Sequence, residues 1–287
     1  METNITLNDK KPLLKGWVSA LLIILPFFIV AGAFQLAGYL LLGYDLESPP
    51  ETLTGETVIQ LIALTGTLLL VFIFTRYIDR ATFKNLGFQL KGHGKDIFLG
   101  IALGAIIMSL GFYILWASGE INITNIDFDS YKLLLSIVLF ACISFNEEIL
   151  LRGYILNNFS RSMNKYWALL CSSLVFSVLH VFNPDFDWMG FSSILLSGLL
   201  LGTSYIYTKN LWFPVALHFS WNFFQGTVFG FHVSGNSTYA IIHQQHKENN
   251  LLNGGEFGFE GSILSLLFIV AAILLVGWRF SKKQIKN

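Results

Sequence analysis

The chain has 287 residues, of which 54% are hydrophobic and only 13% are charged. Soluble domains carry roughly 25% charged residues, so this composition excludes an ordinary soluble domain and indicates that most of the chain avoids water. The formal net charge is zero, which leaves no surplus of basic residues for phosphates and excludes a nucleic-acid partner.

Long apolar runs follow one another along the chain. A helix of roughly 20 apolar residues crosses a bilayer core about 30 Å thick. The runs cover residues 16–43, 58–75, 97–118, 131–159, 167–182, 191–207, 211–231 and 262–280. The first run is too long for the apolar part of a signal peptide, so we expect it to remain as a membrane helix. The sequence predicts an all-α polytopic membrane helix bundle of about eight transmembrane helices, in a single integral membrane domain over residues 1–287.

The charged residues between the runs alternate in sign. Basic residues precede the first run and follow the second, fourth, sixth and eighth, whereas acidic residues follow the first, third and fifth. Because basic residues mark the cytoplasmic side of a membrane protein, this alternation predicts that both termini are cytoplasmic. The segment 234–261, which is rich in Asn, Gly and His, is then expected to be an external loop.

Strongly polar side chains stand inside three of the runs. An ionisable group in a bilayer costs at least about 2.5 kcal/mol on insertion scales, so such groups are functional candidates. They are Glu147, Glu148 and Arg152 in the fourth run, His180 in the fifth, and His218 with Asn222 in the seventh.

The spacing of the three charged residues in the fourth run indicates one ion pair and one carboxylate without a partner. Glu148 and Arg152 are four residues apart, so they share a helix face and can form an ion pair. Glu147 points about 100° away from Glu148 on the same helix, which leaves it without that partner and free to face a cavity.

The two histidines also have neighbours at helical spacing. Phe176 precedes His180 by four residues, so its ring can pack beside the imidazole, and His218 and Asn222 share a face in the same way. The runs place His180 near the outer end of its helix and His218 near the cytoplasmic end, about 10 Å or more apart in depth. We expect tilted or offset helices to bring them together, with Pro214 interrupting the start of the seventh helix.

A carboxylate, two imidazoles and an amide on three helices suit peptide hydrolysis. A buried carboxylate beside a histidine can deprotonate a water, and a histidine and an asparagine can donate hydrogen bonds to the oxyanion that forms. Alternatively, Glu147, His180 and His218 could ligate a metal ion, which would lower the pKa of a bound water.

Other interpretations of the same residues remain open. Glu148 and Arg152 could be a structural ion pair, and each histidine could be a contact between helices. A proton-coupled transporter could use a glutamate and two histidines as a relay, although no paired interrupted spans indicate the inverted repeats of such proteins. No His-Glu-x-x-His motif of a zincin-type protease is present.

The three motifs resemble those of one family. Glu147-Glu148-x-x-x-Arg152, Phe176-x-x-x-His180 and His218-x-x-x-Asn222 occur in the order and on the spans found in the CPBP intramembrane proteases, also called the CAAX prenyl endopeptidase or Abi family. The resemblance covers a core at residues 130–226, and the remaining runs match only as generic membrane helices.

The resemblance implies a role for each motif. Glu147 would be the general base assisted by His180, and His218 and Asn222 would form the oxyanion site. Glu148, Arg152 and Phe176 would give structural support. The resemblance leaves two possibilities open for the cofactor. Either Glu147, His180 and His218 hold a zinc ion, or the site works without a cofactor.

The resemblance also implies a substrate, which would be a membrane-associated protein or peptide, lipidated in the CAAX proteases. Bacterial members are linked to bacteriocin immunity, so a non-catalytic immunity or scaffold protein is the alternative function. The Asn and Lys content of the external loop resembles that of low-GC bacterial proteins, which predicts a multi-pass protein of a bacterial cell membrane.

Overall fold

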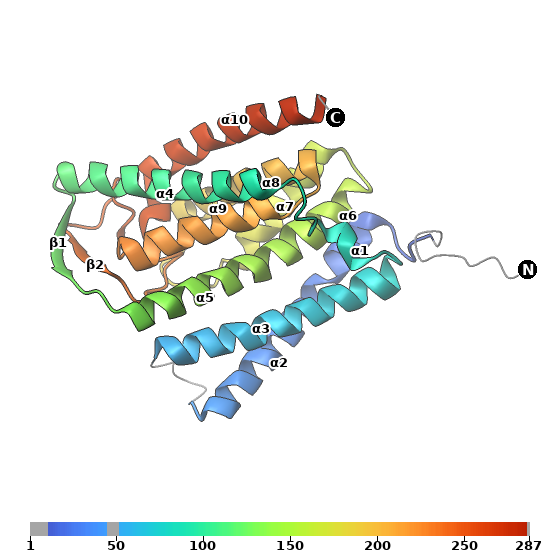
Figure 1. The fold of residues 1–287 in the computed structure, drawn as a ribbon, viewed down its shortest axis with the longest axis horizontal. Helices are drawn as coiled ribbons and strands as arrows, with labels where there is room; N and C mark the ends of the chain where they lie inside the picture. The colour runs from blue at the N-terminus through green and yellow to red at the C-terminus, as the bar shows by residue number, and fades with distance from the viewer. Residues whose placement is uncertain (1–10, 45–51, 286–287) are drawn as a thin grey trace, which may run out of the picture.

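A computed structural model describes residues 11–44 and 52–285. Several residues of the charge pattern lie outside the described residues, namely Lys10, Asp45, Glu47, Glu51 and Lys286. The helices of the bundle are α1 (Gly16–Leu22), α2 (Ile24–Leu42), α3 (Leu53–Ile73), α4 (Gly94–Ala117), α5 (Ser130–Glu148), α6 (Asn157–Ser160), α7 (Lys165–Leu179), α8 (Trp188–Thr208), α9 (Trp212–Asn222) and α10 (Ile263–Ile285). Figure 1 shows them as one bundle, so the all-α prediction is confirmed.

Shorter elements extend or connect these helices. Three are π-helical, η2 (Phe74–Ile78), η4 (Ile149–Leu156) and η5 (Phe223–Val228), and three are single 3₁₀ turns, η3 (Phe83–Leu86), η6 (Gly255–Phe257) and η7 (Phe259–Gly261). Two strands, β1 (Ile121–Ile126) and β2 (Ile242–His246), pair antiparallel. The sequence did not predict this pairing, which joins the expected external loop to the segment between α4 and α5.

Each of the eight predicted runs forms a helix, but their lengths differ. Among the described residues, six helices are long and apolar enough to cross a membrane, Gly16–Leu42, Leu53–Ile78, Gly94–Ala117, Ser130–Ser160, Trp188–Thr208 and Ile263–Lys282. The fifth run forms α7, which has only 15 residues, and the seventh forms α9, whose 11 residues continue into η5. The exact number of membrane crossings therefore stays a prediction.

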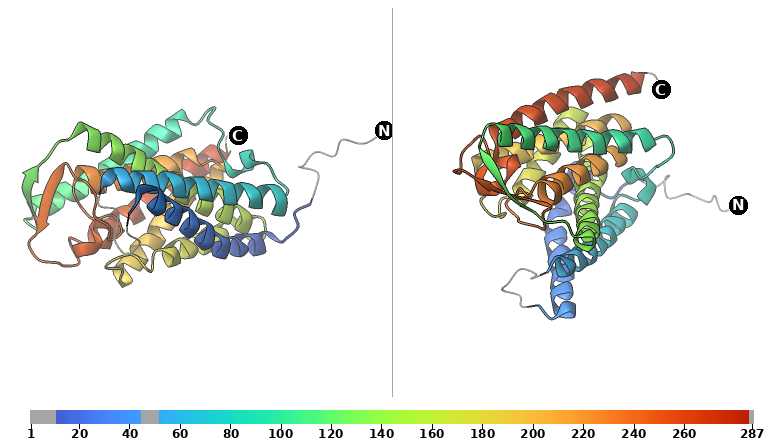
Figure 2. Two further views of the ribbon diagram at one scale, coloured as in Figure 1. Left: turned by 90° about the horizontal axis from the view of Figure 1, so that it is seen from below. Right: turned by 60° about the vertical axis from the view of Figure 1, so that its left-hand side comes forward.

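The α2–α3 hairpin lies on one side of the bundle and α4, α9 and α10 lie on the other (Figure 1). α5 packs against both α3 and α9, and so runs between the two groups. In the right-hand view of Figure 2, the α2–α3 hairpin extends below the other helices. The start of α1 and the end of α10 lie at the same end of the bundle, opposite the β1–β2 sheet, while the side of the membrane that they face stays a prediction.

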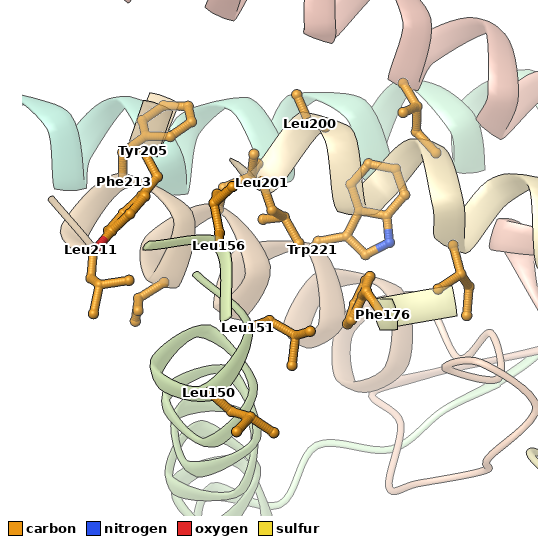
Figure 3. Close-up of a cluster of buried hydrophobic side chains, with 14 of the residues drawn as sticks. Leu150, Leu151, Leu156, Phe176, Leu200, Leu201, Tyr205, Leu211, Phe213 and Trp221 are labelled. Carbon is orange, nitrogen blue, oxygen red and sulfur yellow. The ribbon is translucent and has the colours of Figure 1, made fainter. Parts of the chain in front are cut away.

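The core of the bundle joins the helices that carry the candidate residues. Leucines of η4 pack with Phe176 of α7, Leu200 and Leu201 of α8 and Trp221 of α9 (Figure 3). Close backbone approach holds α9 on its other side, because a Cβ added to Gly104 of α4 would lie 2.9 Å from Ser220. Small residues at such contacts let membrane helices approach closely.

Candidate active site

The carboxylate of Glu147, in the last turn of α5, faces two imidazoles from two other helices. Its Oε2 atom lies 3.9 Å from Nε2 of His180 and 3.9 Å from Nε2 of His218. Three side chains from the fourth, fifth and seventh runs, those of Glu147, His180 and His218, therefore meet at one point.

The difference in depth of about 10 Å or more that the runs imply does not separate the two histidines, because both Nε2 atoms lie 3.9 Å from the same oxygen of Glu147. α7 ends at Leu179 and His180 caps it, so His180 does lie at the end of its helix as predicted, but α7 has only 15 residues and is shorter than a bilayer core, which keeps this end within reach of α5 and α9. Pro214 does not interrupt α9, because it lies in the first turn, where proline is tolerated.

Glu148 and Arg152 form a buried ion pair behind the cavity. Nη1 of Arg152 donates to Oε1 of Glu148 at 2.7 Å, and the two side chains are 1% and 0% exposed. Nη2 of Arg152 donates to the carbonyl of Gly198 in α8 at 3.3 Å, and the guanidinium lies 4.5 Å from the ring centre of Phe176 in α7. This pair therefore ties α5 and η4 to two further helices.

Glu148 has a second partner that the sequence spacing did not reveal. Nδ1 of His218 donates to the same Oε1 atom of Glu148 at 2.9 Å. Because a carboxylate only accepts, this bond places a hydrogen on Nδ1 and turns Nε2 of His218 toward Glu147.

His180 is oriented by a backbone group. Its Nδ1 donates to the carbonyl of Phe176 at 2.8 Å, one of the carbonyls left free at the end of α7. Its Nε2 atom therefore also faces Glu147. The ring of Phe176 packs edge-on against both imidazoles, with ring centres 4.7 Å from His180 and 6.3 Å from His218.

A cavity of about 880 Å³ opens in front of these residues. Glu147, His180, His218 and Asn222 all line it. Asn222 is 5% exposed, and its side chain makes no hydrogen bond to any other residue that the structure describes. Its amide is therefore free to bind a ligand in the cavity.

One wall of the cavity depends on Glu260, a residue that the sequence analysis missed. Nε1 of Trp221 donates to Oε1 of Glu260 at 3.0 Å, while the backbone N and Oγ of Ser234 donate to Oε2 at 2.9 and 2.7 Å. Trp221, Glu260 and the segment 233–238 all line the cavity. No spacing rule connects a loop residue to a helix about 40 residues earlier, so no sequence pattern could have predicted this contact.

The donor types of Glu147, His180 and His218 suit zinc, but their spacing does not. A tetrahedral zinc ion with ligands at about 2.0–2.1 Å holds its ligand atoms roughly 3.3 Å apart. Oε2 of Glu147 lies 3.9 Å from each Nε2 atom, and no group of three His, Cys, Asp or Glu within the described residues is arranged to hold a metal ion.

Comparison with protein families gives one match. Residues 129–224 match the family model described as type II CAAX prenyl endopeptidase Rce1-like. The match covers about a third of the chain and includes Glu147, His180, His218 and Asn222. Comparison with curated proteins and with solved structures found no match.

Proposed function

Because residues 129–224 place the chain with the Rce1-like CAAX prenyl endopeptidases of the CPBP family, we propose that the protein is an intramembrane endopeptidase in which Glu147 is the general base. The observation that carries this proposal is the meeting of three side chains from three helices. One oxygen of Glu147 faces the Nε2 atoms of both His180 and His218, inside a cavity of a helix bundle.

The distances suit a water molecule as the nucleophile. A separation of 3.9 Å between Oε2 of Glu147 and Nε2 of His180 is too long for a direct hydrogen bond, but one water can bridge such a gap. Glu147 takes a proton from this water. The oxygen of the resulting hydroxide attacks the carbonyl carbon of the scissile bond. The bond between that carbon and the amide nitrogen then breaks as Glu147 gives the proton to the leaving amine, so the products are a carboxylic acid and an amine and Glu147 is regenerated.

The opposite side of the site binds the oxyanion. The side-chain amide of Asn222 donates one hydrogen bond to the oxygen of the tetrahedral intermediate, and Nε2 of His218 donates the second. Nδ1 of His218 already donates to Glu148, so the ring must be protonated for Nε2 to donate as well. The Glu148 carboxylate stabilises that imidazolium and fixes its orientation.

The substrate follows from the position of the site. The cavity lies among apolar helices, so we propose a membrane-associated protein or peptide, lipidated as the family description implies, as the substrate. The protein would act as a multi-pass protein of a bacterial cell membrane.

The test compares wild-type protein with Glu147→Gln in lipid nanodiscs. A farnesylated membrane peptide and its unmodified form are incubated with each protein in the presence of a zinc chelator, and the products are identified by mass spectrometry. We expect cleavage by the wild type and a loss of about 10²-fold or more in Glu147→Gln. If Glu147→Gln retains full biological protection in a bacteriocin-immunity assay, the non-catalytic immunity or scaffold function is correct instead.

A further inference from the structure

The cavity extends beyond the catalytic residues to a second group of polar side chains. Gln35 and Tyr39 lie one turn apart on α2, Glu56 and Gln60 lie one turn apart on α3, and all four line the cavity that contains Glu147. α2 has no charged residue, and Gln35 is its only side chain with an amide. Polar groups in membrane helices usually face one another or a cavity with a function, so this group requires an explanation.

The charge of the cavity is one-sided. Glu56, Glu147 and Glu260 line it, and no lysine or arginine of the described residues does. Glu147 faces two imidazoles, and Glu260 accepts three hydrogen bonds from Trp221 and Ser234. The carboxylate of Glu56 makes no hydrogen bond or ion pair with any other residue that the structure describes, which leaves it available to a ligand.

Glu56 lies in the first turn of α3, where the helix dipole favours an acidic residue. That effect explains an acid at the helix start. It does not explain why Glu56 lines the same cavity as Gln60 one turn later and two polar residues of α2. Together these four residues could surround a cationic group with one carboxylate and several neutral acceptors.

The distance from this group to Glu147 follows from the packing of two helices. α3 and α5 pack against each other and run in the same direction in Figure 1, and the hydroxyls of Thr54 and Tyr131 lie 3.3 Å apart at their starts. Glu147 is much farther from Tyr131 along α5 than Glu56 is from Thr54 along α3. At about 1.5 Å per residue this places Glu56 roughly 20 Å from Glu147 along the helix axes. An extended peptide at about 3.3 Å per residue covers that distance with about six residues.

We propose that Glu56, together with Gln35, Tyr39 and Gln60, binds a lysine or arginine side chain of the substrate about six residues from the scissile bond. The proposal rests on the proposed endopeptidase function and adds a specificity site to it. A single carboxylate in a partly dehydrated cavity attracts a cation and disfavours an acidic residue, so it selects among membrane peptides by charge.

The test measures binding separately from cleavage. Full-length protein carrying Glu147→Gln is placed in phosphatidylcholine nanodiscs, which have no anionic lipid to attract cations. The probes are fluorescent 12-residue Leu/Ala peptides with one lysine, moved through the sequence, and matched peptides with norleucine in its place. Glu56→Gln is added to this background, and Glu248→Gln serves as the matched control because Glu248 is exposed and does not line the cavity.

We expect the best lysine peptide to bind about tenfold more tightly than its norleucine partner, which corresponds to about 1.4 kcal/mol. Adding Glu56→Gln should reduce this ratio to about twofold or less, and adding Glu248→Gln should leave it unchanged. Glu56→Lys should reverse the preference toward a glutamate peptide, a gain that misfolding would not produce. Equal binding of the two peptides to the starting protein, or a lysine preference that persists in Glu56→Gln, would overturn the proposal.

Cleavage of the same peptides by protein with Glu147 intact tells the two proposals apart. Lysine-selective binding without cleavage contradicts the endopeptidase function and leaves the cation site standing as a ligand site. Cleavage without any preference for lysine contradicts the cation site and leaves the endopeptidase function standing.

Discussion

His218 and Arg152 donate to the same oxygen of Glu148. The His218 Nδ1 atom lies 2.9 Å from Oε1 of Glu148, and Nη1 of Arg152 lies 2.7 Å from it. This shared carboxylate connects the buried ion pair to a residue that faces the cavity. Glu148 therefore supports the site in two ways, by neutralising Arg152 and by fixing which nitrogen of His218 carries a hydrogen.

Glu148→Gln should impair the reaction more than the binding of substrate. The neutral amide does not stabilise a protonated His218 ring, so the oxyanion loses the charged donor at Nε2. Removing one donor of an oxyanion site costs about 10²–10³-fold in kcat, so we expect a loss of about 10²-fold here. Separate measurements of kcat and KM check this, because KM should stay near the wild-type value. A rise in KM with kcat unchanged would show that Glu148 acts on substrate binding instead.

Arg152→Ala should lower stability before it affects chemistry. The substitution leaves Glu148 buried without its cation, and breaking a buried pair typically costs about 3–5 kcal/mol. Arg279→Ala is the matched control, since Arg279 is exposed on α10 and its loss should cost less than about 0.5 kcal/mol. Denaturant unfolding in micelles measures both. A similar loss of stability in Glu147→Gln would contradict the distinction between a structural pair and a free carboxylate.

Glu260→Gln should weaken the wall of the cavity that contains Trp221 and Ser234. Glu260 accepts from Trp221 and twice from Ser234, and hydrogen bonds to a charged group contribute about 1.5–3 kcal/mol each. An amide can still accept, so we expect a loss of about 1–3 kcal/mol in unfolding free energy rather than the full sum. The control is Glu256→Gln on the same outer segment, where the glutamate is exposed. Equal unfolding temperatures for wild type and Glu260→Gln would show that these bonds do not support the fold.

The β1–β2 sheet should lose stability in acid. Burial lowers the pKa of His246, with a smaller contribution from His232 that Glu256 opposes. The unfolded chain has a histidine pKa of about 6.5, and the folded pKa of His246 lies below it. The neutral ring therefore contributes its full stability above about pH 6.5. This contribution is lost as the pH falls through the folded pKa. The protection factors of β1 amides, corrected for the intrinsic pH dependence of amide exchange, should therefore fall below about pH 6.

His246→Gln should remove part of this pH dependence, because glutamine does not titrate. His243→Gln is the control, since His243 is exposed on the other face of β2. If both variants retain the acid sensitivity of the wild type, another group is responsible for it.

The sequence predicted the residues of the candidate site better than the contacts between them. Glu147, His180, His218 and Asn222 stand out because polar groups are costly in apolar helices, and helical spacing separates Glu147 from the Glu148–Arg152 pair. The meeting of the two histidines at Glu147 depends on how α7 and α9 lie against α5, and spacing within one helix does not report how separate helices are offset.

Contacts between distant segments left no local signal. The sharing of Glu148 by His218, the bonds of Glu260 to Trp221, and the pairing of β1 with β2 each join residues of separate helices or loops. Glu56 precedes the second apolar run and so looks like a loop charge in the sequence, although the structure places it inside α3 and against the cavity. Periodicity reports which residues share a face, but not which faces meet.

The most direct test of the account is the turnover of Glu147→Gln, measured with its folding in the same nanodisc sample. We expect an unfolding temperature equal to that of the wild type and a cleavage rate lower by about 10²-fold or more, because the amide cannot take a proton from water. Wild-type cleavage by a folded Glu147→Gln protein would contradict the assignment of Glu147 as the general base.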